Sequence, residues 1–186
     1  MSAAEIVLNA STIGRYAGGL SYKSTEPLTV TLGDNVAIAS TGYAGIESVA
    51  PVTIRSPAGK TLSITVKNDS AILFGIEAPS VNVESGNIDI SMKSDSGKGG
   101  ATGIYAVAGN VTITGGSVSA TVWTGSHKNK GIYASHYIVI SSGQVTLDER
   151  GGSNTFGLDG GDVENGNADG GILISGGFVS VNSSGG

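Results

Sequence analysis

Short runs in which apolar and polar side chains alternate fill most of the chain. In residues 109–122, GNVTITGGSVSATV, two such runs follow each other with only a Gly-Gly pair between them. Strict alternation with a period of two is typical of β-strands that bury one face. The pattern therefore predicts pairs of short strands joined by tight corners.

A three-residue phrase, glycine followed by Ile or Leu and a variable residue, precedes each pair of runs. It recurs at intervals of 26 to 30 residues, and its glycines are Gly19, Gly45, Gly75, Gly103, Gly131 and Gly157. Three short strands in a repeat of this length indicate a solenoid, in which each strand pairs in parallel with its equivalent about 4.8 Å along the axis. We expect an all-β, single-stranded parallel β-helix with about six coils of three short strands.

The apolar members of the alternating runs are expected to point inward and to stack coil upon coil. The expected inward pairs are Leu28/Val30, Val52/Ile54, Val81/Val83, Val111/Ile113, Ile138/Ile140 and Ile172/Ile174 in the first runs, and Val36/Ile38, Leu62/Ile64, Ile88/Ile90, Val118/Val122, Val145/Leu147 and Val179/Val181 in the second. Between the runs, glycine recurs at one corner, as Gly86, Gly116, Gly143 and Gly177. Such a corner requires a positive φ or a close backbone approach, which glycine accepts without a Cβ clash.

The phrase Gly-Ile-Tyr-Ala at 103–106 and 131–134, together with Val-Thr-Ile-Thr-Gly-Gly-Ser-Val-Ser-Ala at 111–120, carries a family resemblance. It resembles the single-stranded right-handed parallel β-helix proteins of the pectate-lyase-like superfamily, and more closely the repetitive bacterial cell-surface β-helix proteins that bind carbohydrate. The resemblance covers residues 17–182 and implies right-handed coils, which the bias of parallel crossovers also favours. It is specific for the fold and weak for function, because one fold serves many activities.

Composition narrows the classes of partner. The chain has 31 glycines but only three phenylalanines and one tryptophan, which favours many thin coils over one large core. Ten basic and fifteen acidic residues without a Lys/Arg cluster argue against nucleic acid. The sequence contains no run of about 18 apolar residues, the length that would predict a membrane-spanning helix. The absence of cysteine excludes disulfides, and the composition favours an extracellular or cell-surface protein whose leader has been removed.

The variable residue of the repeated phrase is expected to point outward and to stack in register. This ladder would be Ser21, Glu47, Glu77, Tyr105, Tyr133 and Asp159. Loops after the second strand of each coil, over residues 91–102, 123–130 and 148–156, are expected to bring further side chains toward it: Asp95, Lys98, Trp123, His127, Lys128, Asp148 and Arg150.

Aromatic rings flanked by polar groups can stack on sugar rings and bind their hydroxyls. The sequence therefore predicts a polysaccharide or glycan site without catalytic residues, formed by Tyr105, Tyr133, Trp123, His127, Asp95, Lys128 and Asp148. The alternative is that the tyrosines and Trp123 pack flat against the sheet.

An acidic, glycine-rich segment over residues 159–169 is a candidate metal site. Its carboxylates, Asp159, Asp162, Glu164 and Asp169, are the hard oxygen ligands that calcium prefers. Their spacing matches neither the EF-hand nor the tandem nonapeptide of calcium-binding repeats. A calcium site and a solvated acidic loop both remain open, and no other cofactor is expected.

Polysaccharide lyase activity is an alternative function, because lyases of the resembled fold use calcium-holding carboxylates. Glu47 and Glu77 would lie about 5 Å apart on neighbouring coils, the separation of paired glycosidase carboxylates. No basic residue accompanies them in the repeat frame except Arg55 and Lys67 on other strands, so a solvated pair is expected. The two histidines, His127 and His136, do not suggest a hydrolase triad.

We expect one solenoid domain over residues 1–186. Residues 1–16 would supply a first strand and a candidate N-terminal cap, and residues 17–182 the repeats. Solenoids usually carry polar caps over their terminal edges, and neither end shows a clear one. Two interpretations stay open: a module of a longer repeat protein, or a subunit whose ends stack head to tail into filaments.

Overall fold

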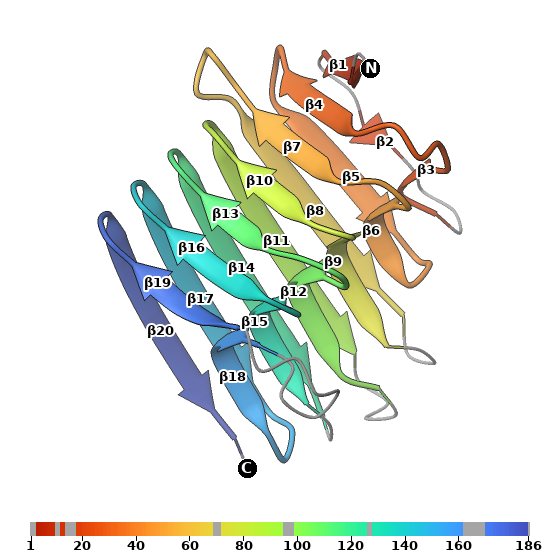
Figure 1. The fold of residues 1–186 in the computed structure, drawn as a ribbon. Coiled ribbons are helices and arrows are strands. Elements are labelled where there is room, and N and C mark those ends of the chain that lie inside the picture. Colours follow the sequence, from red (N-terminus) through yellow and green to blue (C-terminus); the bar gives the residue numbers. More distant parts are fainter. Residues whose placement is uncertain are drawn as a thin grey trace.

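The computed structural model describes residues 3–9, 12–13, 18–68, 72–94, 99–125, 128–161 and 170–185. Within them every regular element is a β-strand, and the strands form three parallel sheets that run along one solenoid (Figure 1). The prediction of an all-β parallel solenoid with three strands in each coil is confirmed. Helices long and apolar enough to cross a membrane are absent from this part of the chain.

Each sheet collects one strand from every coil. Sheet A contains β1 (Ala4–Leu8), β4 (Leu28–Leu32), β7 (Val52–Arg55), β10 (Val81–Val83), β13 (Val111–Ile113), β16 (Tyr137–Ile140) and β19 (Gly171–Ile174). Sheet B contains β2 (Thr12–Ile13), β5 (Val36–Ser40), β8 (Thr61–Lys67), β11 (Asn87–Ser94), β14 (Ser117–Thr124), β17 (Gln144–Arg150) and β20 (Phe178–Ser184). Sheet C contains β3 (Leu20–Tyr22), β6 (Ala44–Ser48), β9 (Leu73–Ala78), β12 (Ala101–Ala106), β15 (Asn129–Ala134) and β18 (Thr155–Gly160).

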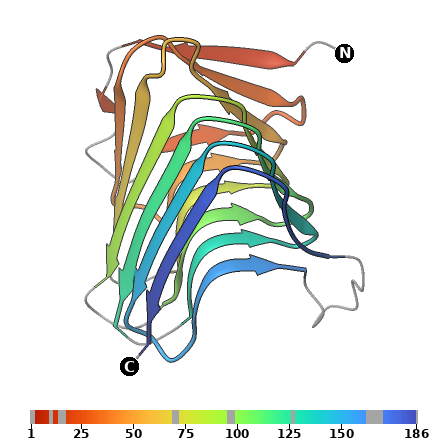
Figure 2. The same cartoon turned by 90° about the vertical axis from the view of Figure 1, so that its left-hand side faces the viewer.

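Equivalent residues of successive coils pair directly. Val111, for example, pairs with Val81 on one side and with Ile138 on the other. Figure 2 shows equivalent strands following one behind another, from the red N-terminal coil to the blue C-terminal coil. Because the pairing is parallel and in register, equivalent positions of successive coils lie over one another along the solenoid.

The core is a thin aliphatic column between the three sheets. All the inward pairs expected from the alternation are buried, except Ile172, Ile174, Val179 and Val181 in the last coil. Those four side chains are partly or largely exposed because no further coil covers them in the described chain. Ile104 and Ile132 are fully buried, which confirms the inward face of sheet C.

The glycine of the repeated phrase marks a close approach between coils. A Cβ on Gly103 would lie 2.5 Å from the carbonyl oxygen of Gly131 and 3.0 Å from the Cβ of Ala120. Gly45 and Gly131 have the same relation to the carbonyl oxygen of the next phrase glycine, at 2.8 and 2.7 Å. Only glycine leaves room for this approach, and this explains why the phrase recurs.

The glycines at the corners between sheets A and B adopt a positive φ. Gly86, Gly116, Gly143 and Gly177 have φ values between 73 and 89°, in the left-handed region. This confirms the expectation that the bend between the strands of sheets A and B uses a backbone conformation that other residues rarely adopt.

Candidate functional site

The outward ladder of sheet C forms in the predicted register. Ser21 pairs with Glu47, Glu47 with Glu77, Glu77 with Tyr105, Tyr105 with Tyr133, and Tyr133 with Asp159. The ladder crosses β3, β6, β9, β12, β15 and β18 in turn (Figure 1). Along the ladder, the acidic Glu47 and Glu77 are followed by the aromatic Tyr105 and Tyr133, and the last position is Asp159.

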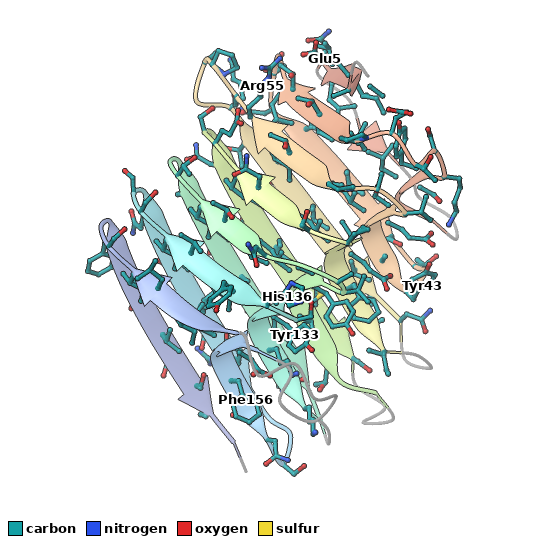
Figure 3. All side chains as sticks on the ribbon, viewed as in Figure 1. Glu5, Tyr43, Arg55, Tyr133, His136 and Phe156 are labelled. Atoms are coloured by element: carbon teal, nitrogen blue, oxygen red, sulfur yellow. The ribbon has the colours of Figure 1, made fainter. Side chains whose placement is uncertain are left out.

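Four aromatic side chains form a continuous row on this face: Tyr43, Phe74, Tyr105 and Tyr133. The rings of Tyr105 and Tyr133 stack with centroids 4.9 Å apart, and those of Phe74 and Tyr105 stack at 4.8 Å. Tyr43 meets Phe74 edge to face at 6.4 Å. Figure 3 labels Tyr43 and Tyr133 at the two ends of this aromatic row.

The stacking leaves little open ring face in the centre of the aromatic row. Phe74 lies against one face of Tyr105 and Tyr133 against the other. Tyr133 is 8% exposed although it belongs to the outward ladder. The tyrosine rings therefore pack mainly against one another and against Phe74. A ligand at this face would contact the ring edges and hydroxyl groups.

Lys130 closes the C-terminal end of the aromatic row. Its Nζ lies 4.1 Å from the ring centroid of Tyr133 and 2.6 Å from Oδ2 of Asp159. Asp159, a predicted calcium ligand, is thus engaged in an ion pair. The other three predicted ligands, Asp162, Glu164 and Asp169, lie outside the described residues. Within the described ranges, no three acidic or histidine side chains gather as a metal site.

A groove of about 370 Å³ opens beside the aromatic row. Its walls are Ile72, Phe74, Gly99, Gly100, Thr102, Tyr105, Lys128 and Lys130. We call it the aromatic groove. It brings together Tyr105 and Lys128, two residues expected from the sequence, with Phe74, Ile72 and Lys130, which were not. Its charged wall residues are both cationic, in a protein whose net charge is -5.

Trp123 and Asp148 do not join the tyrosines. The expectation that they lie in loops is wrong, because β14 continues through Thr124 and β17 through Arg150. Both side chains therefore occupy strand positions on the outer face of sheet B. Trp123 is 50% exposed, and Lys93 Nζ lies 4.8 Å from its ring centroid.

Asp148 forms an ion pair with Arg150, with 2.8 Å between Oδ2 and Nη2. Arg150 also lies in β17, and not in a loop beside the ladder. Of the remaining predicted site residues, Asp95 and His127 lie outside the described residues, as does Lys98.

The acidic end of the ladder is a network around Glu47. Lys23 forms an ion pair with Glu47 Oε1, and Ser21 Oγ donates a hydrogen bond to Oε2 at 3.2 Å. Lys23 was missed because it lies in the loop after β3, outside the repeat frame. Hydrogen bonds from Lys23 and then Tyr43 lower the pKa of Glu47. The same contact with Glu47 raises the pKa of Tyr43 to about 12.

Glu77 sits one coil further along and behaves differently. Burial first, and then the charge of Glu47, raise the pKa of Glu77 above its ordinary value. The two carboxylates are thus in different environments, but both oxygens of Glu47 already accept hydrogen bonds from side chains of its own network. Glu47 is therefore held in place by its ion pair with Lys23 and by the hydrogen bond from Ser21.

No protein-family model, no curated protein and no solved structure matches this chain. The geometry of the coils therefore establishes the fold class, a parallel β-solenoid with three parallel sheets.

Proposed function

We propose that this β-solenoid is a non-enzymatic binding protein that holds a polysaccharide or glycan in the aromatic groove, at the cell surface or outside the cell. The observation that carries the proposal is the groove itself, which combines apolar walls with two lysines. The sequence resemblance to right-handed carbohydrate-binding β-helices supports the same ligand class.

The groove offers both kinds of contact that a sugar needs. Phe74, Tyr105 and Ile72 supply apolar surface for the C–H face of a pyranose ring. The exposed Lys128 supplies a charged donor for ring substituents, while Lys130, paired with Asp159, adds positive charge to the wall; charge-assisted hydrogen bonds are stronger than neutral ones. Because Tyr105 is stacked on both faces, Phe74 and the ring edges carry the apolar contact.

The double substitution Phe74→Ala with Tyr105→Ala is expected to weaken glycan binding at least about tenfold, because it removes the apolar wall of the groove. Binding on a glycan array, followed by calorimetry on the best ligand, measures the change. Tyr137→Ala is the matched control, since Tyr137 is an exposed aromatic residue on sheet A.

A substitution at the exposed Lys128 distinguishes an effect on ligand binding from an effect on stability. Lys128→Ala is expected to weaken binding about threefold to tenfold while leaving the unfolding midpoint unchanged. Unaltered affinity in both the double variant and Lys128→Ala would remove the groove as the binding site.

A second candidate function, end-to-end assembly, is supported by the exposed last coil. Ile172, Ile174 and Val181 are about half exposed, and Phe178 is 60% exposed. The strands β18, β19 and β20 also present unpaired edges in the described chain, as β1, β2 and β3 do at the opposite end. Unpaired parallel edges with apolar side chains are templates for a further coil, including that of a second copy.

If copies stack end to end, the protein is expected to form concentration-dependent oligomers in sedimentation experiments, and Phe178→Lys with Val181→Lys is expected to abolish them. Val107→Lys, at an exposed apolar side chain after β12, is the control that leaves assembly intact. A monomer at every concentration would contradict this second candidate.

A further inference from the structure

A carboxylate interrupts the aliphatic core on sheet B. One inward column reads Val66, Met92, Val122 and Glu149 on β8, β11, β14 and β17, and ends at Ser183 on β20. The first three side chains are buried aliphatic or thioether groups, and Glu149 is as fully buried as they are. Carboxylates are almost never fully buried unless they are paired.

Glu149 has only a partial set of partners. Ser183 Oγ donates a hydrogen bond of 2.6 Å to Oε2. The other oxygen, Oε1, is buried and has no hydrogen-bond partner among the described residues. An ionised carboxylate in this position would leave one oxygen desolvated and unsatisfied, which is costly.

Among the described residues, the strands packed against Glu149 offer it no unengaged cationic side chain. On β17 itself, Arg150 is engaged by Asp148. On sheet C, Lys130 of β15 is engaged by Asp159 of β18. Tyr133 is the other titratable side chain of β15, and β14 and β20 carry no charged residue.

Burial is the largest cause of the resulting shift. Together with the charge of Asp148, and against the hydrogen bond from Ser183, it raises the pKa of Glu149 to about 7 from an ordinary value of 4.5. The folded protein therefore holds a proton that the unfolded chain has released between these two pH values. The contribution of Glu149 to stability therefore falls as the pH rises from about 4.5 to about 7, and does not change further above that range.

We propose that the pairing of β20 with β17 is linked to protonation: neutral Glu149 lets the two strands pack tightly, and ionised Glu149 loosens β20. The geometry makes β20 the responsive element. It supplies Ser183, whose hydroxyl is the side-chain donor to Glu149 among the described residues, and its side chains are mostly exposed, whereas β14 on the other side of β17 is covered by further coils. Water reaches the ionised carboxylate by displacing β20.

Amide hydrogen exchange of the whole chain tests the proposal. After correction for intrinsic exchange rates, the protection of the β20 amides is expected to fall on the order of 100-fold between pH 5 and pH 8, because about two units of the shift from 4.5 to about 7 lie above pH 5 and each unit is a factor of ten in the equilibrium. The amides of β11, which lies three coils away on the same sheet, are expected to change far less.

Three variants distinguish protonation from packing. Glu149→Gln keeps the shape without the charge and is expected to make β20 protection independent of pH. Glu149→Val, which copies Val122, is expected to do the same and serves if the glutamine variant folds poorly. Ser183→Ala removes the hydrogen bond that favours the ionised form, so the midpoint of the transition is expected to move to higher pH.

Asp148→Asn is the control, because it changes the neighbouring exposed ion pair while leaving Glu149 in place. It is expected to retain the transition. A wild-type protein whose β20 protection does not change with pH, or a transition that persists in both Glu149 variants, would overturn the proposal.

Discussion

Replacing Gly103 by alanine is expected to destabilise the protein by about 3 kcal/mol, a large effect for the addition of one methyl group. The new Cβ would lie 2.5 Å from the carbonyl oxygen of Gly131, and this obstacle is backbone that belongs to the next coil. The clash is removed only if β12 and β15 move apart, and this movement weakens the hydrogen bonding between these two strands. Urea unfolding followed by circular dichroism measures the loss.

Gly171→Ala is the matched control for this substitution. Gly171 also lies in a strand, but the nearest atom to its added Cβ is a ring carbon of Tyr137 at 4.0 Å. Its replacement is expected to change stability by less than about 0.5 kcal/mol. Equal effects of the two substitutions would mean that the phrase glycines are not constrained by the stacking of coils.

Ile90→Ala is expected to cost about 3 kcal/mol, because it opens a cavity in the aliphatic column. Ile90 is fully buried, and it stacks between Ile64 of the preceding coil and Ala120 of the following coil. A thin column offers few neighbouring side chains that can collapse into the space. The same urea titration gives the difference in free energy of unfolding.

Asp89→Ala tests the opposite face of the same strand. Asp89 precedes Ile90 in β11 and is exposed, so its replacement is expected to be nearly neutral. If Asp89→Ala proved as costly as Ile90→Ala, the assignment of inner and outer faces in sheet B would be wrong.

The repeat pattern carries most of the information about the fold. The interval of the Gly-(Ile/Leu)-x phrase predicts the coil, and the alternation predicts the inner face of both following strands. The ladder from Ser21 to Asp159 follows directly, because register in a solenoid is set by the repeat itself. The corner glycines are predicted for the same reason, since a recurring bend needs the same backbone conformation each time.

The candidate site is less predictable because much of it lies outside the repeat frame. Phe74 precedes the phrase glycine, where the neighbouring coils have Ala44 and Thr102, so no repeated signal marks it as part of the aromatic row. The sequence predicts a loop from Trp123 onward because no sharp signal marks where the preceding strand ends. Position 123 is the next outward position after Ser119 and Thr121, and this continued period of two is the signal that assigns Trp123 to β14.

Glu149 illustrates a conflict between two sequence rules. The alternation of Val145, Leu147 and Glu149 predicts an inward side chain, whereas its charge predicts an outward one. The structure follows the alternation because a one-residue slip would turn the whole of β17 to the other face. Burial of one carboxylate is the smaller cost.

Stacking of equivalent strands in register is the claim on which the rest depends, and spin-label distances along one outward row test it most directly. The chain contains no cysteine, so pairs of introduced cysteines label it uniquely. Ala39, Thr65 and Asn182 belong to the same outward row of sheet B, which continues through Ser91, Thr121 and Asp148.

Electron–electron double resonance is expected to give about 19 Å for labels at Thr65 and Asn182 and about 24 Å for labels at Ala39 and Asn182, four and five spacings of about 4.8 Å. The difference between the two pairs, one coil, is independent of the length of the label. Distances that do not increase by one strand spacing, or that spread broadly beyond about 35 Å, would contradict a solenoid whose coils lie directly over one another.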